Sequence, residues 1–267
     1  MKTNLLFTGI LSIVFFTTHL VYAQPSRMIA VVDFMKVDIE NAQEYRKLEQ
    51  TFKKVHKARM EQGDLLNWAL YRIGGAGTAS EYNAVTVNFY SDNAGLAKHF
   101  ETSMLEGYSD VLTEEEMKLI DRTARLRDLV KTEVYELSFS VQDTSVRALP
   151  KVIWMVYRTL MEDKSMDDVL EIENKMVKPV IEKGIRNGTI EGYFFYKLNY
   201  PSGNITDYQL AQLYSYDNME QMLDYPPTYG KEFAKIYGGM AGLPFRFGVS
   251  QIYKAELWQL VECACED

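Results

Sequence analysis

The sequence has few of the residue types that build metal centres and disulfide frameworks. Its 267 residues include two cysteines, three histidines and seven prolines. A structural zinc site needs four closely held ligands, mostly Cys and His, so we expect no metal site and no cofactor. The two cysteines, Cys263 and Cys265, form a C-x-C pair near the C-terminus, which we interpret as incidental thiols of a frayed tail. A redox pair and half of a metal site are the alternatives.

Positive charge is also scarce. The chain has 29 Lys and Arg residues against 37 Asp and Glu residues, for a formal net charge of −8, and no cluster of basic residues. Nucleic-acid binding depends largely on neutralising phosphates, so no nucleic-acid partner is expected. The sequence also lacks the phosphate-binding G-x-x-x-x-G-K-[ST] motif, the G-x-S-x-G nucleophile motif and the H-E-x-x-H zinc motif. These absences exclude several common enzyme classes, while 47% hydrophobic residues indicate a globular protein.

Long apolar runs are absent after the first residues. Lys2 precedes an apolar stretch over 5–21, and Val21-Tyr22-Ala23 matches a small-residue cleavage site. We therefore predict that residues 1–23 are a signal peptide cut after Ala23, and that the protein is periplasmic or secreted. The stretch is interrupted by polar residues and is short for a membrane span, so no stable membrane anchor is expected.

An internal repeat organises the rest of the chain. Residues 48–72 and 172–197 align with one inserted residue in the second copy, and the match extends in both directions. A repeat of this length predicts two copies of one structural unit. We place the first module at 24–140, a linker at 141–149 and the second module at 150–267. The aligned pairs are Glu49 with Glu173, Gly63 with Gly188, Trp68 with Tyr193 and Tyr71 with Tyr196.

Each copy alternates between strand and helix patterns. Residues 29–37 and 152–160 are apolar at both odd and even positions, which is typical of strands covered on both faces. Helical spacing follows over 40–62 and 167–187, and Gly63 and Gly188 are expected to end those helices. Strand pairs are predicted at 65–72 with 82–90 and at 190–198 with 208–216. Helices over 93–105 and 113–129 and a strand over 131–137 complete the first copy.

The second copy is expected to be more broken in its later part. Its final strand is predicted at 254–260, and Pro226-Pro227 and Gly238-Gly239 interrupt the preceding helical segment. In the first copy, Thr113 and Glu116 have the spacing of a capping box. The element order of each copy is β-α-β-β-α-β, which is a ferredoxin-like arrangement.

This doubled order carries a resemblance to a known superfamily. The recurring glutamate of the first helix is followed in both copies by G-x-[LI]-x-x-[WY]-x-[LF]-Y-[RK], and the chain resembles the dimeric α+β barrel superfamily. Its members include antibiotic-biosynthesis-type and haem-degrading monooxygenases, small cyclases and NIPSNAP-like proteins. The resemblance implies an α+β fold in which two tandem ferredoxin-like modules pack sheet to sheet as a pseudo-dimeric α+β barrel. It also implies ligand cavities between each sheet and its helices, but no single activity.

Glu49 and His56 are the candidate catalytic pair. They lie seven residues apart on one predicted helix, about 10 Å along its axis, and project in nearly the same direction. Such a pair can act as base and proton donor or grip a polar ligand; alternatively, both are solvated residues beside the apolar stripe. The histidine is replaced by Val180 in the second copy, which marks a site specific to the first half. The candidate substrate-binding residues are Phe52, Trp68, Tyr71, Tyr82, Glu173, Tyr193 and Tyr196.

Three functions remain open from the sequence. The leading hypothesis is an exported protein that binds an apolar or aromatic small molecule, as a cofactor-independent monooxygenase, isomerase or cyclase. The second is a non-catalytic binding or scaffold protein of the cell envelope. The third is a haem binder, although the resemblance implies a haem-ligating histidine on the other helix, not at His56. We expect a monomer with an internal pseudo-two-fold axis, or a weak homo-oligomer.

Overall fold

Eight strands and the helices between them make up the part of the chain that the computed structural model describes, which is residues 27–142, 149–203, 206–239 and 248–265. The predicted signal peptide lies outside the described residues, as does most of the predicted linker. The first half contains β1 (Ile29–Lys36), α1 (Ala42–Glu61), β2 (Asn67–Ile73), β3 (Ala84–Tyr90), α2 (Asn93–Glu101), α3 (Glu114–Ile120), α4 (Thr123–Leu126) and β4 (Asp128–Gln142). The second half contains β5 (Val152–Leu160), α5 (Met166–Ile172), a π-helical turn (Glu173–Val177), α6 (Lys178–Arg186), β6 (Gly192–Tyr200), β7 (Leu210–Tyr216), α7 (Met219–Tyr237) and β8 (Ser250–Cys263).

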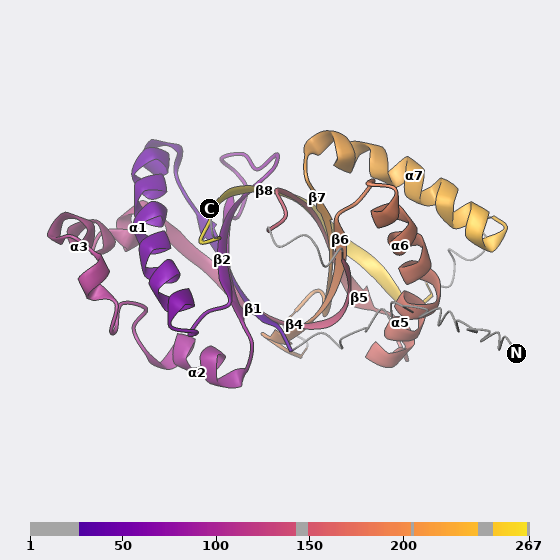
Figure 1. Ribbon diagram of the computed structural model, residues 1–267, viewed down its shortest axis with the longest axis horizontal. Coiled ribbons are helices and arrows are strands. Elements are labelled where there is room, and N and C mark those ends of the chain that lie inside the picture. Colours follow the sequence, from indigo (N-terminus) through magenta and orange to yellow (C-terminus); the bar gives the residue numbers. More distant parts are fainter. Residues whose placement is uncertain (1–26, 143–148, 204–205, 240–247, 266–267) are drawn as a thin grey trace, which may run out of the picture.

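The strands form one closed barrel in the order β4-β1-β3-β2-β8-β5-β7-β6, and every neighbouring pair is antiparallel. The first four strands in this order come from the first half of the chain and the other four from the second half. The two sets face each other across the interior and are joined at both edges, by β2 with β8 and by β4 with β6. Helices α1 to α3 cover the barrel on one side and α5 to α7 on the other (Figure 1). The described chain is therefore α+β, with the helices outside the barrel.

Burial on both faces of the strands confirms the two-sided apolar pattern. On β1, Val31 and Met35 belong to the core under α1, whereas Val32 and Phe34 belong to the core inside the barrel. A third core lies in the second half and includes Ile181 of α6. Alternate side chains of a strand point to opposite faces, so one strand supplies both the interior core and a helix-facing core.

The ends of several helices agree with the expectations. Gly63 and Gly188 follow the first long helix of each half with φ of +79° and +68°, conformations that glycine adopts without steric cost. The amide of Asp64 donates to the carbonyl of Arg59 at 2.9 Å, which closes the end of α1. The capping box of Thr113 and Glu116 is present at the start of α3.

Helix α7 corrects the expectation of a broken segment, because it continues through Pro226-Pro227 and ends only at Gly238, with φ of +72°. Tyr225, Tyr229, Phe233 and Tyr237 follow one another at helical spacing, with successive ring centroids 4.8–6.2 Å apart. Tyr225 also packs on Tyr214 and Tyr216 of the sheet. This aromatic row holds α7 on the barrel and offsets the backbone hydrogen bonds that the two prolines remove.

The final strands are longer than predicted. β4 continues past the predicted boundary at residue 140 as far as Gln142, and β8 reaches Cys263. Both extensions pair with the other half of the chain. The C-terminal segment therefore stays bonded to the sheet as far as Ala264, which corrects the expectation of a frayed tail. Ala264 is buried, and its amide donates to the carbonyl of Trp68 at 3.0 Å. Cys263 and Cys265 form a disulfide instead of remaining thiols.

The inserted residue of the second repeat coincides with an irregular helical turn. Residues 173–177 form a π-helical turn between α5 and α6, and such a turn accommodates one residue more than an α-helical turn. With the extra residue here, the position of His56 corresponds to Ile181 and not to Val180. Both are buried aliphatic residues. None of the described helices is long and apolar enough to span a membrane.

Candidate functional site

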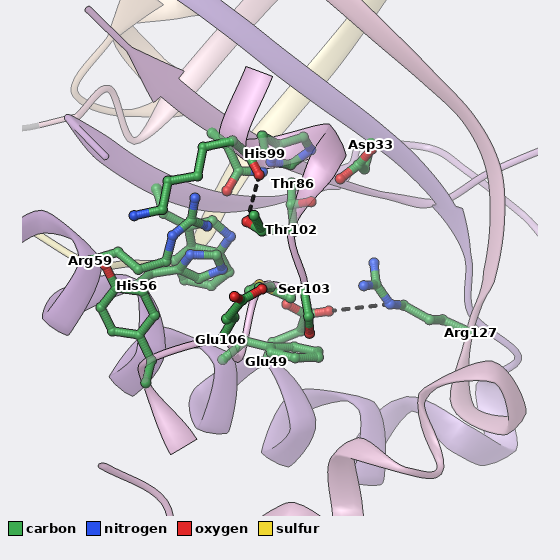
Figure 2. Close-up of a pocket in the computed structure, with 16 residues that line it drawn as sticks. Asp33, Glu49, His56, Arg59, Thr86, His99, Thr102, Ser103, Glu106 and Arg127 are labelled. Carbon is green, nitrogen blue, oxygen red and sulfur yellow. Dashed lines mark hydrogen bonds and ion pairs between the residues drawn. The ribbon is translucent and has the colours of Figure 1, made fainter. Parts of the chain in front are cut away.

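A small cavity lies between α1, the sheet and the segment after α2 in the first half. Its volume is about 70 Å³. Figure 2 shows polar side chains from several elements pointing into it. The lining residues are Asp33, Glu49, Phe52, His56, Arg59, Trp68, Thr86, Asn88, Lys98, His99, Thr102, Ser103, Met104, Glu106, Tyr108 and Arg127. Four of the predicted site residues, Glu49, Phe52, His56 and Trp68, are thus brought together here.

Glu49 lies on the buried face of α1 and is 2% exposed. Its Oε1 has no hydrogen-bond partner among the described residues, and the Nε of Arg127 is 3.8 Å from it. Burial raises the pKa of this carboxyl group, while Arg127 and the Tyr45 hydroxyl oppose the rise. The carboxyl group of Glu49 is therefore protonated more easily than that of an exposed glutamate.

His56 is covered on one face by an aromatic ring. It is 3% exposed, and its ring is stacked on Trp68 with centroids 4.9 Å apart and an interplanar angle of 15°. Burial lowers the pKa of His56 well below its usual value, and the charge of Arg59 lowers it further. The imidazole is thus neutral near pH 7, and its Nδ1 has no hydrogen-bond partner in the described chain.

A third unsatisfied atom belongs to the strand below the helix. Asn88 of β3 is buried, and its Oδ1 has no partner among the described residues. A buried polar group without a partner costs about 1–3 kcal/mol, and such groups are rare in folded proteins. Three of them, on Glu49, His56 and Asn88, line one cavity. This concentration indicates a site that receives a polar molecule.

Other polar side chains border the same cavity. The Tyr90 hydroxyl is 2.7 Å from Nδ1 of His99 and accepts a hydrogen bond from Arg59 at 3.3 Å. Burial lowers the pKa of His99, and the charge of Arg59 acts in the same direction. Sequence reasoning missed Asn88, Arg59 and Arg127 as site residues. A signal for the first was present, because Thr86 and Asn88 are polar at alternate positions of an otherwise apolar strand.

The corresponding place in the second half is built differently. Glu173 is 1% exposed and accepts hydrogen bonds from the Tyr193 hydroxyl and from Nε2 of Gln212, both at 2.8 Å. Arg158 donates to Oε1 of Gln212 at 3.3 Å and to the carbonyl of Ser250 at 2.8 Å. Glu173 and Tyr193, both predicted to bind substrate, are thus brought together as members of a hydrogen-bonded network.

The remaining predicted tyrosines do not line the helix-side cavity. Tyr71 and Tyr196 lie inside the barrel, and Tyr82 also belongs to the interior core. The reason is strand periodicity: Tyr71 is three residues after Trp68 on β2, so the two side chains point to opposite faces. Among the described residues, no group of three or more His, Cys, Asp or Glu is arranged to hold a metal ion.

Comparisons with known proteins were made at the levels of sequence and structure. No protein-family model matches the sequence, and no curated protein matches it significantly. Among solved structures, a "putative monooxygenase" from Fusobacterium nucleatum subsp. nucleatum has a TM-score of 0.54 at 10% identity, covering 90% of this chain and 95% of that one. An anthrone oxidase-like protein has a TM-score of 0.52 at 8% identity, covering 90% and 93%. At such low identity these likenesses concern the fold alone.

Proposed function

We propose that this chain, which has the dimeric α+β barrel fold, binds a small carbonyl compound between Glu49 and His56 and transfers protons to and from it. The observation that carries the proposal is the cavity of about 70 Å³ lined by three buried polar atoms without partners. Two of those atoms belong to groups that exchange protons. Burial raises the pKa of Glu49 and lowers the pKa of His56, so it favours the neutral form of both: a carboxylic acid that can donate a proton and an imidazole that can accept one.

The simplest chemistry for this pair is enolisation. The neutral imidazole of His56 carries its hydrogen on Nε2. Its Nδ1 accepts a proton from the carbon beside the carbonyl group of the substrate. The protonated carboxyl of Glu49 donates a proton to the carbonyl oxygen, so that a ketone becomes its enol with no net change in charge. In a substrate with a hydroxyl group or a double bond next to the enol, return of the proton to a different carbon completes an isomerisation. Attack of the enol carbon on a second carbonyl group of the same molecule, with transfer of the enol proton to the new hydroxyl group, completes a cyclisation. Oxygenation of the enol requires molecular oxygen as a co-reactant.

The volume of the cavity restricts what enters it. About 70 Å³ accommodates roughly two water molecules at the density of the liquid, whereas an engineered cavity that binds benzene is about 150 Å³. The substrate is therefore a small carbonyl compound, or the carbonyl end of a larger apolar or aromatic molecule. In the second case the rest of the molecule lies past the cavity lining formed by residues 102–108.

Haem does not fit this cavity. The porphyrin ring is several times larger than the available volume of about 70 Å³, and the His56 ring lies flat against Trp68, which leaves no room for a macrocycle on that face. No step of the proposed reaction passes through iron. Haem binding would be recognised by a Soret band after addition of haem to the protein.

Hydrogen exchange tests the proposal without knowledge of the final product. Small ketones and aldehydes are incubated with the protein in D2O, and loss of the proton signals beside the carbonyl group is followed by NMR. The wild type is expected to accelerate exchange for at least one compound. His56→Ala should slow it by roughly two to four orders of magnitude, whereas Tyr71→Phe, on the other face of the sheet, should leave it unchanged.

A non-catalytic binding protein is the second candidate, because the same partnerless atoms would also hold a ligand that does not react. In that case the compounds bind to wild type, as seen by ligand-observed NMR, but exchange is no faster than in buffer. Equal exchange rates for wild type and His56→Ala would contradict the catalytic proposal.

We also propose that the chain consists of two copies of a ferredoxin-like module. The support is the strand order, in which β4-β1-β3-β2 of the first half and β8-β5-β7-β6 of the second half have the same arrangement. Since both edges of each set are already paired within the chain, a monomer is expected by size-exclusion chromatography with light scattering. Export is proposed from the apolar stretch before Ala23, and sequencing of the N-terminus of secreted or periplasmic material should begin at Gln24.

A further inference from the structure

The interior of the barrel contains a larger cavity, on the opposite face of the sheet from the Glu49 and His56 pocket. Its volume is about 380 Å³, and all eight strands contribute to its lining. This volume lies within the range of about 300–1,000 Å³ that is typical of small-molecule sites. Nothing in the proton-transfer proposal uses this space. It therefore needs an explanation of its own.

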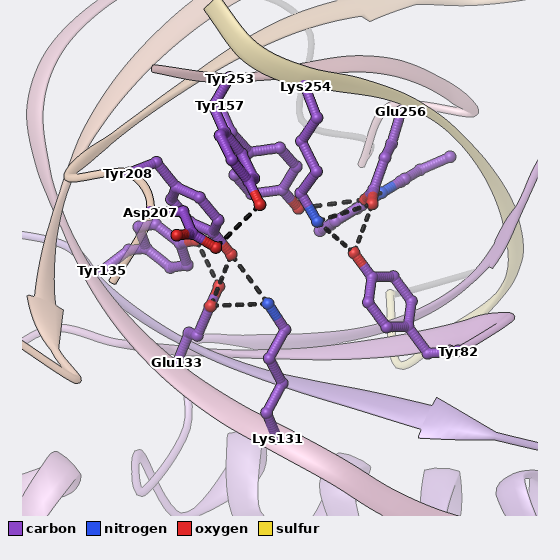
Figure 3. Close-up of polar contacts among 11 residues, drawn as sticks. Tyr82, Lys131, Glu133, Tyr135, Tyr157, Asp207, Tyr208, Tyr253, Lys254 and Glu256 are labelled. Atoms are coloured by element: carbon purple, nitrogen blue, oxygen red, sulfur yellow. Dashed lines mark hydrogen bonds and ion pairs between the residues drawn. The ribbon is translucent and has the colours of Figure 1, made fainter. Parts of the chain in front are cut away.

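One end of the cavity is closed by a polar cluster in which the charges are paired within the protein. Lys131 pairs with Glu133 at 2.9 Å, and Lys254 pairs with Glu256 at 3.0 Å. Figure 3 shows these two pairs and the tyrosines that bond to them. At the edge of the cavity, Tyr135 and Trp258 donate hydrogen bonds to the two glutamates. The floor of the cavity therefore consists of side chains whose polar groups are already bonded.

The walls are mainly apolar and carry no charge. The lining side chains include Ala30, Ile153, Met155 and Leu213, and none of the described lining residues is acidic or basic. A charged ligand would lose its hydration here without gaining an opposite charge, which is costly. The cavity thus favours a neutral and mainly apolar molecule.

The lining also carries polar groups, which belong to Asn67, Ser140, Gln142 and to the tyrosines Tyr71, Tyr135, Tyr157 and Tyr196. The hydroxyls of Tyr135 and Tyr157 donate to Glu133 and Glu256. Tyr71 and Tyr196 occupy matching positions in the two halves, and both line the cavity. No hydrogen bond of either hydroxyl is found among the described residues, although buried tyrosine hydroxyls usually have a partner. Burial raises the pKa of both phenols, and Tyr196 is near enough to raise that of Tyr71 further. Both hydroxyls are therefore protonated and available as donors.

We propose that the barrel interior is a second ligand site, which takes a neutral, mainly apolar molecule whose carbonyl oxygen accepts hydrogen bonds from Tyr71 and Tyr196. The site is separate from the helix-side pocket, because the sheet lies between them. It does not depend on the proposed proton transfer.

A pair of probes of nearly equal shape tests this site. 2-Acetylnaphthalene has a carbonyl acceptor, whereas 2-ethylnaphthalene has none. Binding of each to the full chain is measured by ligand-observed NMR and by tryptophan fluorescence, since Trp258 lines the cavity. The double variant Tyr71→Phe with Tyr196→Phe is expected to bind 2-acetylnaphthalene about three- to tenfold more weakly. Its affinity for 2-ethylnaphthalene should be unchanged or higher.

Two blocking variants and one control variant test whether the probes bind inside the barrel. Ala211→Leu adds bulk inside the cavity and should weaken both probes, provided that its thermal unfolding stays cooperative; Ala30→Leu on the opposite wall is the second blocking variant. Glu49→Gln should leave both affinities unchanged. The proposal is overturned if wild type binds neither probe, as when the chain's own residues fill the cavity. It is also overturned if the tyrosine double variant weakens both probes equally, or if Glu49→Gln alone reduces binding.

Discussion

The two spaces between the barrel and its helices, one in each half of the chain, contain the same glutamate with different hydrogen bonding. Glu49 and Glu173 are both on the first long helical segment of their half, and both are almost fully buried. Glu173 accepts hydrogen bonds from Tyr193 and Gln212. Glu49 has an oxygen with no hydrogen-bond partner in the described chain and borders a cavity. A residue that recurs in a repeat can therefore be structural in one copy and available for chemistry in the other.

The difference is caused by the strand beneath each glutamate. The register of β3 and β7 with their neighbours aligns Thr86 with Gln212 and Asn88 with Tyr214. On β7, Gln212 reaches Glu173 and the rings of Tyr214 and Tyr193 pack with centroids 4.9 Å apart, whereas the shorter Thr86 and Asn88 of β3 line the cavity beside Glu49. The two halves therefore differ in the strand residues that face the glutamate, and not in the glutamate itself.

The largest difference between the halves is expected from glutamine substitutions at the two glutamates. Glu173→Gln removes the negative charge and one acceptor oxygen. The remaining oxygen can accept from Gln212, but the NH2 group then faces the Tyr193 hydroxyl, which loses its acceptor and must accept a hydrogen bond instead. Gln212 cannot relieve this by turning its own amide, because Arg158 donates to its Oε1. We expect a loss of about 2–3 kcal/mol in the free energy of unfolding by urea at pH 7.

Glu49→Gln is the matched control. Its Oε1 has no hydrogen bond to lose among the described residues. The ion pair with Arg127 is long, at 3.8 Å, and burial already disfavours the charge of Glu49, so a loss under about 1 kcal/mol is expected. Equal losses in the two variants would show that Glu49 is as firmly bonded as Glu173, and would remove the contrast between the halves.

Much of this fold follows from local sequence patterns. The strands covered on both faces, the first long helices and their terminal glycines were predictable because burial period and glycine conformation act over a few residues. The lengths of β4 and β8 were not, since their extensions are stabilised by pairing with strands of the other half. The continuity of α7 through Pro226-Pro227 was missed for the same kind of reason, because Tyr225 is held by rings of the sheet.

The site was predictable where its residues share one element. Glu49, Phe52 and His56 recur at helical spacing, so their convergence followed from the helix period. Arg127 and Asn88 lie on other elements, and their approach depends on the tertiary fold. Tyr71 does not line the pocket with Trp68, because the two are three residues apart on β2 and therefore point to opposite faces of the sheet.

The pH dependence of stability should differ between the halves because only the first has a buried histidine. The folded-state pKa of His56 lies well below its usual value of 6.5. The contribution of the neutral histidine to the free energy of unfolding is therefore fully present above pH 6.5 and is lost as the pH falls. Between pH 7 and pH 5 this amounts to up to about 2 kcal/mol. His56→Leu, which copies the aliphatic residue of the second half, should remove that part of the pH dependence of urea unfolding.

The raised pKa of Glu49 acts with the opposite sign. Its contribution to the free energy of unfolding is present below pH 4.5, the usual pKa of a glutamate, and is lost as the pH rises through the pKa of Glu49 in the folded protein. The comparison is therefore also made in a Glu49→Gln background, where only the histidine differs. If Glu49→Gln and the Glu49→Gln with His56→Leu double variant have the same pH dependence, His56 is not buried in its neutral form.

The smallest effect, and the most direct conversion of one half into the other, is expected from Thr86→Gln. The new side chain takes the position that Gln212 has beside Glu173, and the cavity of about 70 Å³ gives it room. Its amide should donate to the free oxygen of Glu49 and stabilise the protein by about 1 kcal/mol, as measured by urea unfolding. The same substitution should abolish the proposed hydrogen exchange, because it fills the space in which the carbonyl group binds.

The reverse change, Gln212→Thr, should destabilise the second half, since Glu173 loses a donor. If Thr86→Gln were destabilising while exchange persisted, the cavity would be larger or differently placed than the two short residues of β3 imply, and the contrast between the halves would need another cause.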